Sequence, residues 1–118
     1  MLFRSIRVSQ AQTILFLSGQ VAYTADGGVA CRGDFKGQAR GAYEAIKALV
    51  ESQGGTMANI VKITTFVVNY KPELRPVIGK ARSAFFEGME PPASTLVGVS
   101  ALAAPEWLIE IEAIAVAD

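Results

Sequence analysis

Two carboxylates in the last apolar segment are the residues whose spacing most directly suggests chemistry. Glu110 and Glu112 lie within "WLIEIEAIAVA", residues 107–117. Successive side chains of a strand point to opposite faces, so both acids share one face, about 6.6 Å apart. The rest of that face is apolar, which suits neither a dry core nor free solvent. We therefore predict a subunit interface with polar clefts; the alternatives are a solvated face or a salt bridge between Lys62 and one glutamate.

The composition limits the chemistry that these acids can support. The 118 residues suit one domain, residues 1–118. The absence of histidine removes the usual general base, the Ser-His-Asp triad and most zinc sites, so we expect no metal site. Eleven basic and eleven acidic residues give no net charge and no basic cluster is present, which argues against nucleic-acid binding.

The sequence offers no membrane or export signal. No apolar run reaches eighteen residues, and "MLFRSIRVSQAQ" mixes its apolar residues with arginines, unlike a signal peptide. The single cysteine, Cys31, excludes an intrachain disulfide and predicts a reducing, cytoplasmic location. We expect Cys31 to be a half-buried thiol rather than a nucleophile, because no histidine is available to activate it. A hydrophobic content of 51% indicates subunit contacts or an alanine-rich core.

Periodicity and turn residues predict the elements that position the two acids. A hairpin is expected over 13–23 and 29–33, a helix over 35–53 capped by Asp34, and a strand over 59–70. Prolines then begin a second helix that ends near Glu87, and two strands follow in "STLVGVSAL" and "WLIEIEAIAVA". The order β-β-α-β-α-β-β predicts an α+β fold, with two helices on one face of a mixed sheet.

The apolar positions also predict which side chains face the helices. In the last strand the helix-facing row is Ile109, Ile111, Ala113, Ala115 and Ala117. In the middle strand it is Val61, Ile63, Thr65 and Val67. Gln38 is expected on the polar face of the first helix, and Trp107 is expected to pack at a strand start or an interface.

Five motifs in a fixed order resemble one protein family. They are "LFLSGQVA", "QARGAYEAIKALVESQGG", "NIVKITTFVVN", "PPAST" and "IEIEAIAV". Together they cover nearly the whole chain and are similar to the reactive-intermediate deaminase (RidA or YjgF) family, also called L-PSP endoribonuclease. The resemblance implies a chorismate-mutase-like fold and a homotrimer with a central β-barrel. It also implies small-molecule clefts between subunits and cofactor-independent hydrolysis of an enamine or imine to a keto acid and ammonia.

The resemblance assigns site residues position by position. The glycine of the family's "SGQ" motif, which lies beside the ligand, matches Gly19, and the glutamate that orders the attacking water matches Glu110. Ser94 occupies the position of the arginine that clamps the substrate carboxylate, and Thr95 follows it as a second candidate ligand-binding residue. The resemblance therefore implies Glu110 as the catalytic residue and Gly19 as a ligand contact. Ser94 and Thr95 are expected either to hydrogen-bond a neutral or differently placed ligand or to satisfy backbone groups at the strand end.

Three side chains that bind the ligand in this family are missing from the sequence. Besides the arginine, the N-terminal tyrosine is absent from "RSIRVSQAQ", and the second-helix asparagine aligns with Gly79. A neutral hydrogen bond from Ser94 contributes about 0.5–1.5 kcal/mol, against about 1.5–3 kcal/mol for a charge-assisted bond. We therefore expect at least roughly tenfold weaker binding of a 2-imino acid. Arg32, Arg75 and Arg82 are the candidates to replace the missing cation; the competing interpretation places each on the solvated surface.

Two functions therefore remain open at the sequence level. The first is a divergent hydrolase of an enamine, imine or related C–N substrate that is poor at deaminating 2-aminoacrylate. The second is a non-catalytic small-molecule binding or sensing trimer. A ribonuclease or translation inhibitor, suggested by older family names, is less favoured because the chain has no histidine and no net charge.

Overall fold

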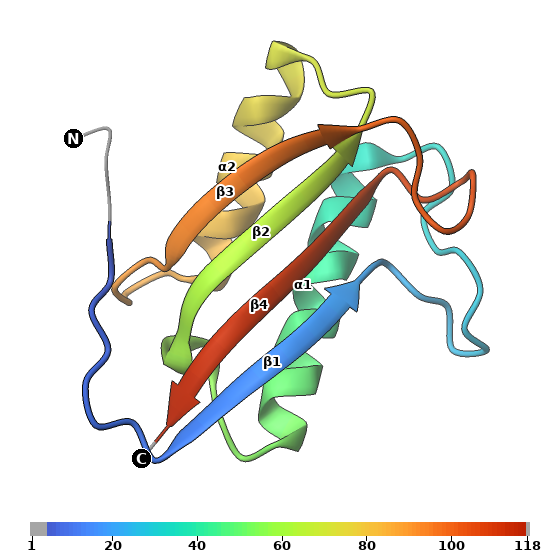
Figure 1. Ribbon diagram of the computed structural model, residues 1–118. Coiled ribbons are helices and arrows are strands. Elements are labelled where there is room, and N and C mark those ends of the chain that lie inside the picture. The colour runs from blue at the N-terminus through green and yellow to red at the C-terminus, as the bar shows by residue number, and fades with distance from the viewer. Residues whose placement is uncertain (1–4, 118) are drawn as a thin grey trace.

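Four segments with alternating apolar residues build one mixed sheet in the computed structural model, which describes residues 5–117 (Figure 1). The strands are β1 (Thr13–Gln20), β2 (Ile60–Val68), β3 (Ala93–Val99) and β4 (Ile109–Ala117). Their order is β1-β4-β2-β3, in which β4 is antiparallel to both neighbours and β2 is parallel to β3. The parallel pair requires a crossover, and the second helix provides it. This arrangement confirms the predicted α+β fold.

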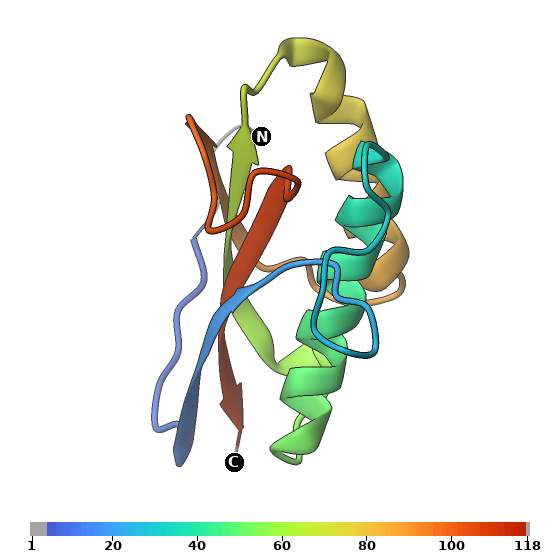
Figure 2. The same cartoon turned by 90° about the vertical axis from the view of Figure 1, so that its right-hand side faces the viewer.

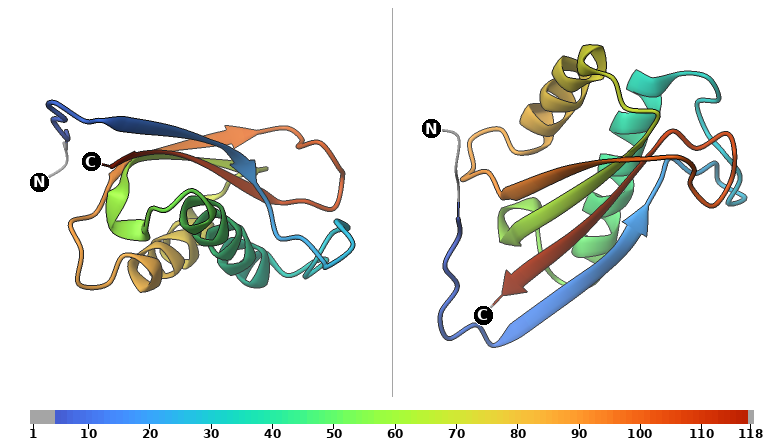
Figure 3. Two further views of the ribbon diagram at one scale, coloured as in Figure 1. Left: turned by 90° about the horizontal axis from the view of Figure 1, so that it is seen from below. Right: turned by 45° about the horizontal axis from the view of Figure 1, so that its top comes forward.

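Two helices cover one face of this sheet (Figure 2). They are α1 (Phe35–Ser52) and α2 (Arg75–Phe85), and the turns η1 (Met57–Asn59) and η2 (Pro72–Leu74) precede β2 and α2. The Asp34 carboxylate caps α1 by accepting from the Gly37 N–H at 3.0 Å, and Gly54 follows its C-cap with φ +83°. Figure 3 shows both helices side by side beneath the sheet. Neither has the length and hydrophobicity needed to cross a bilayer.

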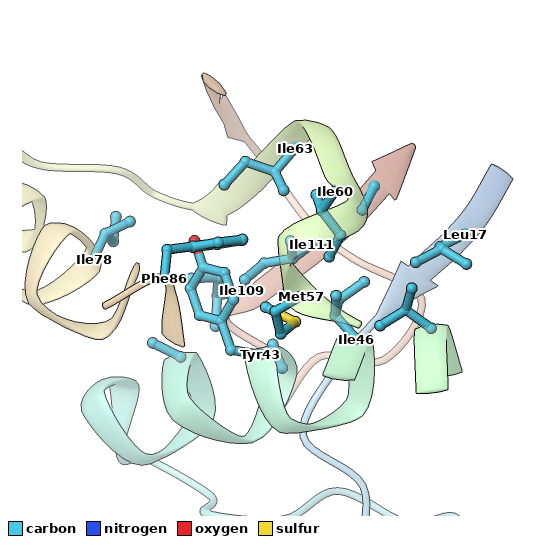
Figure 4. Packing of buried hydrophobic residues seen from close by; sticks show 14 of the residues in the cluster. Leu17, Tyr43, Ile46, Met57, Ile60, Ile63, Ile78, Phe86, Ile109 and Ile111 are labelled. Carbon is cyan, nitrogen blue, oxygen red and sulfur yellow. The ribbon is translucent and has the colours of Figure 1, made fainter. Parts of the chain in front are cut away.

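The core lies between the helices and the sheet, as the alternation predicts (Figure 4). Ile109, Ile111, Ala113 and Ala115 are all buried, and so are Ile63, Thr65 and Val67; Val61 and Ala117 are half-buried. Tyr43 and Ile46 of α1 pack against them. Burial of each large aliphatic or aromatic side chain stabilises the fold by about 1.5–3 kcal/mol. This packing turns Glu110 and Glu112 away from the helices.

The predicted return strand over residues 29–33 is wrong. This segment forms only an isolated bridge between Tyr23 and Val29. Cys31 and Gly33 adopt left-handed backbone conformations, with φ of 54° and 72°, and the Asp34 N–H donates to the Cys31 carbonyl at 3.0 Å. Because these turns redirect the chain into α1, it cannot continue along β1.

Gln38 is fully buried, contrary to its predicted place on the polar face of the first helix. Its side-chain amide donates to the carbonyls of Glu106 (2.9 Å) and Cys31 (3.3 Å), and its oxygen accepts from the Leu108 N–H (2.8 Å). The bonds to Glu106 and Leu108 satisfy partly buried backbone groups just before β4, and the bond to Cys31 ties in the turn before α1. Gln38 therefore fixes the entry of the strand that holds Glu110.

The sheet face opposite the helices exposes large apolar side chains. Phe16 is 79% exposed and Ile14 is 55% exposed, and their partners in β4, Ile114 and Val116, are half-buried. No helix lies over this outer face in Figure 2. A contiguous apolar surface of this kind is typical of a protein contact site.

Candidate functional site

Glu110 lies directly over the backbone of Gly19. In the β1–β4 ladder Leu17 pairs with Ala113 and Gln20 pairs with Ile111, so β1 carries an extra residue between these pairs. This bulge brings Gly19 against the Glu110 side chain: a Cβ on Gly19 would lie 2.6 Å from the carboxyl carbon of Glu110 and overlap its oxygen. Only glycine leaves this space free. Two residues 91 positions apart in sequence thus form one half-buried polar site.

Glu112 has a different environment from Glu110. It is exposed on the outer face, opposite Thr64 of β2, beside a hollow of about 320 Å³ that Phe16 and Ser18 also line. The Lys62 ammonium donates to the hydroxyls of Thr95 (2.7 Å) and Thr64 (3.3 Å). Among residues 5–117 it forms no salt bridge with either acid, so that interpretation of the paired glutamates is wrong.

Ser94 and Thr95 stand at the free edge of the sheet and face opposite sides. Ser94 pairs with Ile63, which faces the helices, and Thr95 pairs with Thr64, which faces outward. A groove of about 690 Å³ runs along this edge between α2 and β3. We call it the α2–β3 groove; its polar lining residues include Lys62, Thr65, Arg75, Arg82, Ser94 and Thr95.

One chain does not bring all four predicted site residues together. Gly19 and Glu110 are in contact, and Ser94 and Thr95 line the α2–β3 groove, but Glu110 and Gly19 do not line that groove. Glu110 is in register with Phe66 in the middle of the sheet, whereas β3 forms its edge. A single site that contains both pairs therefore requires a second copy of the chain.

The three arginines considered as substitutes for the missing cation lie in different places. Arg32 forms a salt bridge with Glu106 at 3.6 Å in the loops beside α1. Arg75 and Arg82 line the α2–β3 groove with Ser94. The interpretation that they are only solvated surface residues therefore leaves out their shared groove. The helical spacing already held this signal, because positions 75, 79 and 82 share one helix face.

Tyr43 places a polar atom in the core beneath the groove. The side chain is 1% exposed, and its hydroxyl has no hydrogen-bond partner among the described residues. Burial raises the Tyr43 pKa to about 12, while the charge of Arg82 and the nearby Thr65 hydroxyl act in the opposite direction. Thr65 is buried in the core and also lines the groove, as Arg82 does.

Cys31 and Trp107, the other residues considered from the sequence, lie in a turn and at a strand start. Cys31 is exposed rather than half-buried, and it lies in a turn of positive φ. Trp107 donates from its indole N–H to the Ala22 carbonyl at 3.3 Å and packs edge-on against Tyr23, which confirms its place at a strand start. Within residues 5–117 no three acidic, cysteine or histidine side chains are grouped to hold a metal ion.

Comparison with known proteins identifies relatives over nearly the whole chain. The family model described as endoribonuclease L-PSP matches residues 5–117. A 2-iminobutanoate/2-iminopropanoate deaminase of Dermatophagoides farinae is 32% identical over 107 residues, which are 91% of this chain and 80% of that protein.

Solved structures agree with that family. YyfB of Yersinia pestis, from the conserved Rid protein family, superposes with a TM-score of 0.89 at 36% identity, covering 93% of this chain and 83% of its own. Escherichia coli TdcF, solved with bound serine, gives a TM-score of 0.80 at 26% identity, covering 100% of this chain and 91% of its own.

Proposed function

The chain belongs to the endoribonuclease L-PSP (RidA/YjgF) family, and from this premise we propose that it is a homotrimer that binds a small metabolite between subunits and hydrolyses its C–N bond. The relative named as a 2-iminobutanoate/2-iminopropanoate deaminase supports an imine or enamine as the substrate class. The observation that carries the proposal is the half-buried Glu110 carboxylate over Gly19.

The proposed reaction needs no resident cofactor. Water adds to the imine carbon, and the electron pair of the C=N π bond passes to nitrogen, which takes a proton. Glu110 accepts a hydrogen bond from the water, removes its proton and returns one to the leaving nitrogen. The hydroxyl of this adduct then gives up its remaining proton as the carbonyl forms, and the C–N bond breaks with its electron pair on nitrogen. Ammonia leaves, so that imine and water give a keto compound and ammonia.

A trimer would bring the two halves of the site together. Phe16 and Ile14 provide an exposed apolar surface on the face that also carries Glu110 and Glu112. The α2–β3 groove, at the sheet edge, would form the wall opposite the Glu110 of a neighbouring copy. Burial of the apolar outer face would also remove bulk water from the carboxylate, which strengthens its hydrogen bond to the attacking water.

Ammonia release from enzymatically generated 2-aminoacrylate tests the proposal. Because Ser94 replaces the family's arginine, we expect turnover to be weak with this short 2-imino acid. Glu110→Gln, which keeps the shape but removes the charge, should abolish turnover. Robust 2-aminoacrylate deamination would refute the weight placed on Ser94, and unchanged turnover in Glu110→Gln would refute the role of Glu110.

The absence of an arginine at position 94 also supports a second function, a non-catalytic binding or sensing trimer. Such a protein would be stabilised by a ligand that remains chemically intact. A rise in melting temperature without ammonia release, for every imine tested, would favour this function.

A further inference from the structure

The α2–β3 groove is lined by cations without acids. Lys62, Arg75 and Arg82 contribute positive charge, and no aspartate or glutamate is found among its lining residues within 5–117. Lys62 already donates to Thr95 and Thr64, whereas the two arginines form no ion pair with any described residue. By contrast, Arg40 of α1 pairs with Glu44 at 3.0 Å. The groove therefore has unbalanced positive charge, which favours an anion.

Arg82 lies on the same side of α2 as Gly79. Its Nη2 atom lies 4.0 Å from where a Cβ on Gly79 would be, and the residue is half-buried. Ser94 lines the same groove from β3. The chain has thus a small residue at 79, a short residue at 94, and a guanidinium between α2 and β3.

The influence of Arg82 on Tyr43 supports this placement. Arg82 lowers the pKa of the buried Tyr43 hydroxyl, in opposition to burial, so its positive charge acts on the core as well as on the groove that it lines. A guanidinium held in a partly desolvated groove binds an oxyanion more strongly than one in free solvent.

We propose that Arg82, with Arg75, is the anion-binding anchor of this protein and selects a substrate with two carboxylates. This inference rests on the proposed function and names its substrate class: the imine or enamine of a small 2-oxo dicarboxylic acid. Arg75 and Arg82 are seven residues apart on α2, about 10.5 Å along the helix axis. Both residues line the groove, and arginine side chains are long enough to converge on one ligand. One carboxylate can pair with one guanidinium, and a second carboxylate of the same ligand can pair with the other.

Binding of stable keto acids by calorimetry at low salt tests the anchor. The probes are 2-oxoglutarate, a dicarboxylate, and 2-oxobutanoate, the keto acid that hydrolysis of 2-iminobutanoate yields. We expect 2-oxoglutarate to bind the wild-type protein at least tenfold more tightly. Arg82→Gln should weaken its binding tenfold or more, because a charge-assisted pair is replaced by a neutral one. Equal affinity for the two acids would overturn the proposed selectivity.

Matched variants separate the anchor from a general charge effect. Arg40→Gln removes the same charge from α1, outside the groove, and should leave 2-oxoglutarate binding unchanged. Arg82→Lys keeps the charge but loses the planar guanidinium, so binding should fall to an intermediate value. In Arg82→Gln/Ser94→Arg a cation returns on β3, and we expect a preference for 2-oxobutanoate. Unaltered 2-oxoglutarate binding in Arg82→Gln would overturn the proposal.

The same variants distinguish this inference from the proposed function. Glu110→Gln should retain 2-oxoglutarate binding while losing turnover. If the wild-type protein binds 2-oxoglutarate through Arg82 but hydrolyses no imine, the anchor stands and the hydrolase proposal fails. If it hydrolyses imines with a KM that Arg82→Gln does not change, the hydrolase proposal stands and the anchor fails.

Discussion

Replacing Gly19 with alanine should displace the Glu110 carboxylate with little loss of stability. A Cβ at position 19 would lie 2.6 Å from the carboxyl carbon, whereas two carbons in contact are about 3.5 Å apart. The carboxylate must therefore move by about 0.9 Å. It sits at the end of a flexible side chain, so we expect the free energy of unfolding to change by less than about 1 kcal/mol.

A shift of this size should be visible in catalysis. A misplacement of about 1 Å in a catalytic group can reduce the rate by about a hundredfold. We therefore expect kcat/KM for imine hydrolysis, measured by ammonia release, to fall between about tenfold and a hundredfold in Gly19→Ala. Urea denaturation of the same preparation checks that the fold is retained.

A double-mutant cycle shows whether this effect passes through Glu110. If Gly19 acts by leaving room for the carboxylate, Gly19→Ala should change nothing further in a Glu110→Gln background. The geometric argument would be refuted if Gly19→Ala had the kcat/KM of the wild type. It would also be refuted if Gly19→Ala lowered kcat/KM by the same factor in the Glu110→Gln background as in the wild type.

Three further predictions concern the framework around the site. Gln38→Leu leaves buried backbone groups of Leu108 and Glu106 unpaired, so we expect the free energy of unfolding in urea to fall by about 2–4 kcal/mol; a change below about 1 kcal/mol would contradict this. The Tyr43 pKa is raised from 10.0 to about 12. The contribution of this side chain to the free energy of unfolding is therefore complete below pH 10 and is lost as the pH rises from 10 to 12. Tyr43→Phe should therefore lose less stability than wild type over that range, and parallel curves for the two proteins would disprove it. Phe16→Glu places a charge on the outer face, so we expect light scattering to give the mass of a 12.5 kDa protomer for this variant and the mass of a trimer for the wild type. A trimer that persists in Phe16→Glu would exclude this face as the interface.

Local pattern predicted the elements of this fold well. The alternation in residues 107–117 identified the buried face of β4, and Asp34 and Gly54 marked the ends of α1. These features depend on neighbours within a few residues, so the sequence carries them directly. The prediction of a return strand over residues 29–33 was wrong because local turn residues do not show that the chain must leave β1 to begin α1.

The resemblance to a known family identified Gly19 and Glu110 as site residues, but the sequence did not show how they meet. A bulge in β1, set by its register with β4, brings Gly19 under the Glu110 carboxylate. Register is a property of two strands together and is not contained in either segment alone. The same limit applies to Gln38, whose partners Glu106 and Leu108 are about seventy residues away in the chain.

The placement of charged residues shows most clearly what the sequence determined and what the tertiary structure decided. The sequence determined that position 94 lacks a guanidinium and that Arg75, Gly79 and Arg82 follow one another at intervals of four and three residues. Only the tertiary structure placed these residues beside the edge strand β3, with the Arg82 guanidinium near Gly79 and Ser94 lining the same groove. Side-chain type and spacing are fixed by covalent order, whereas the surface that a side chain faces is fixed by packing between distant elements.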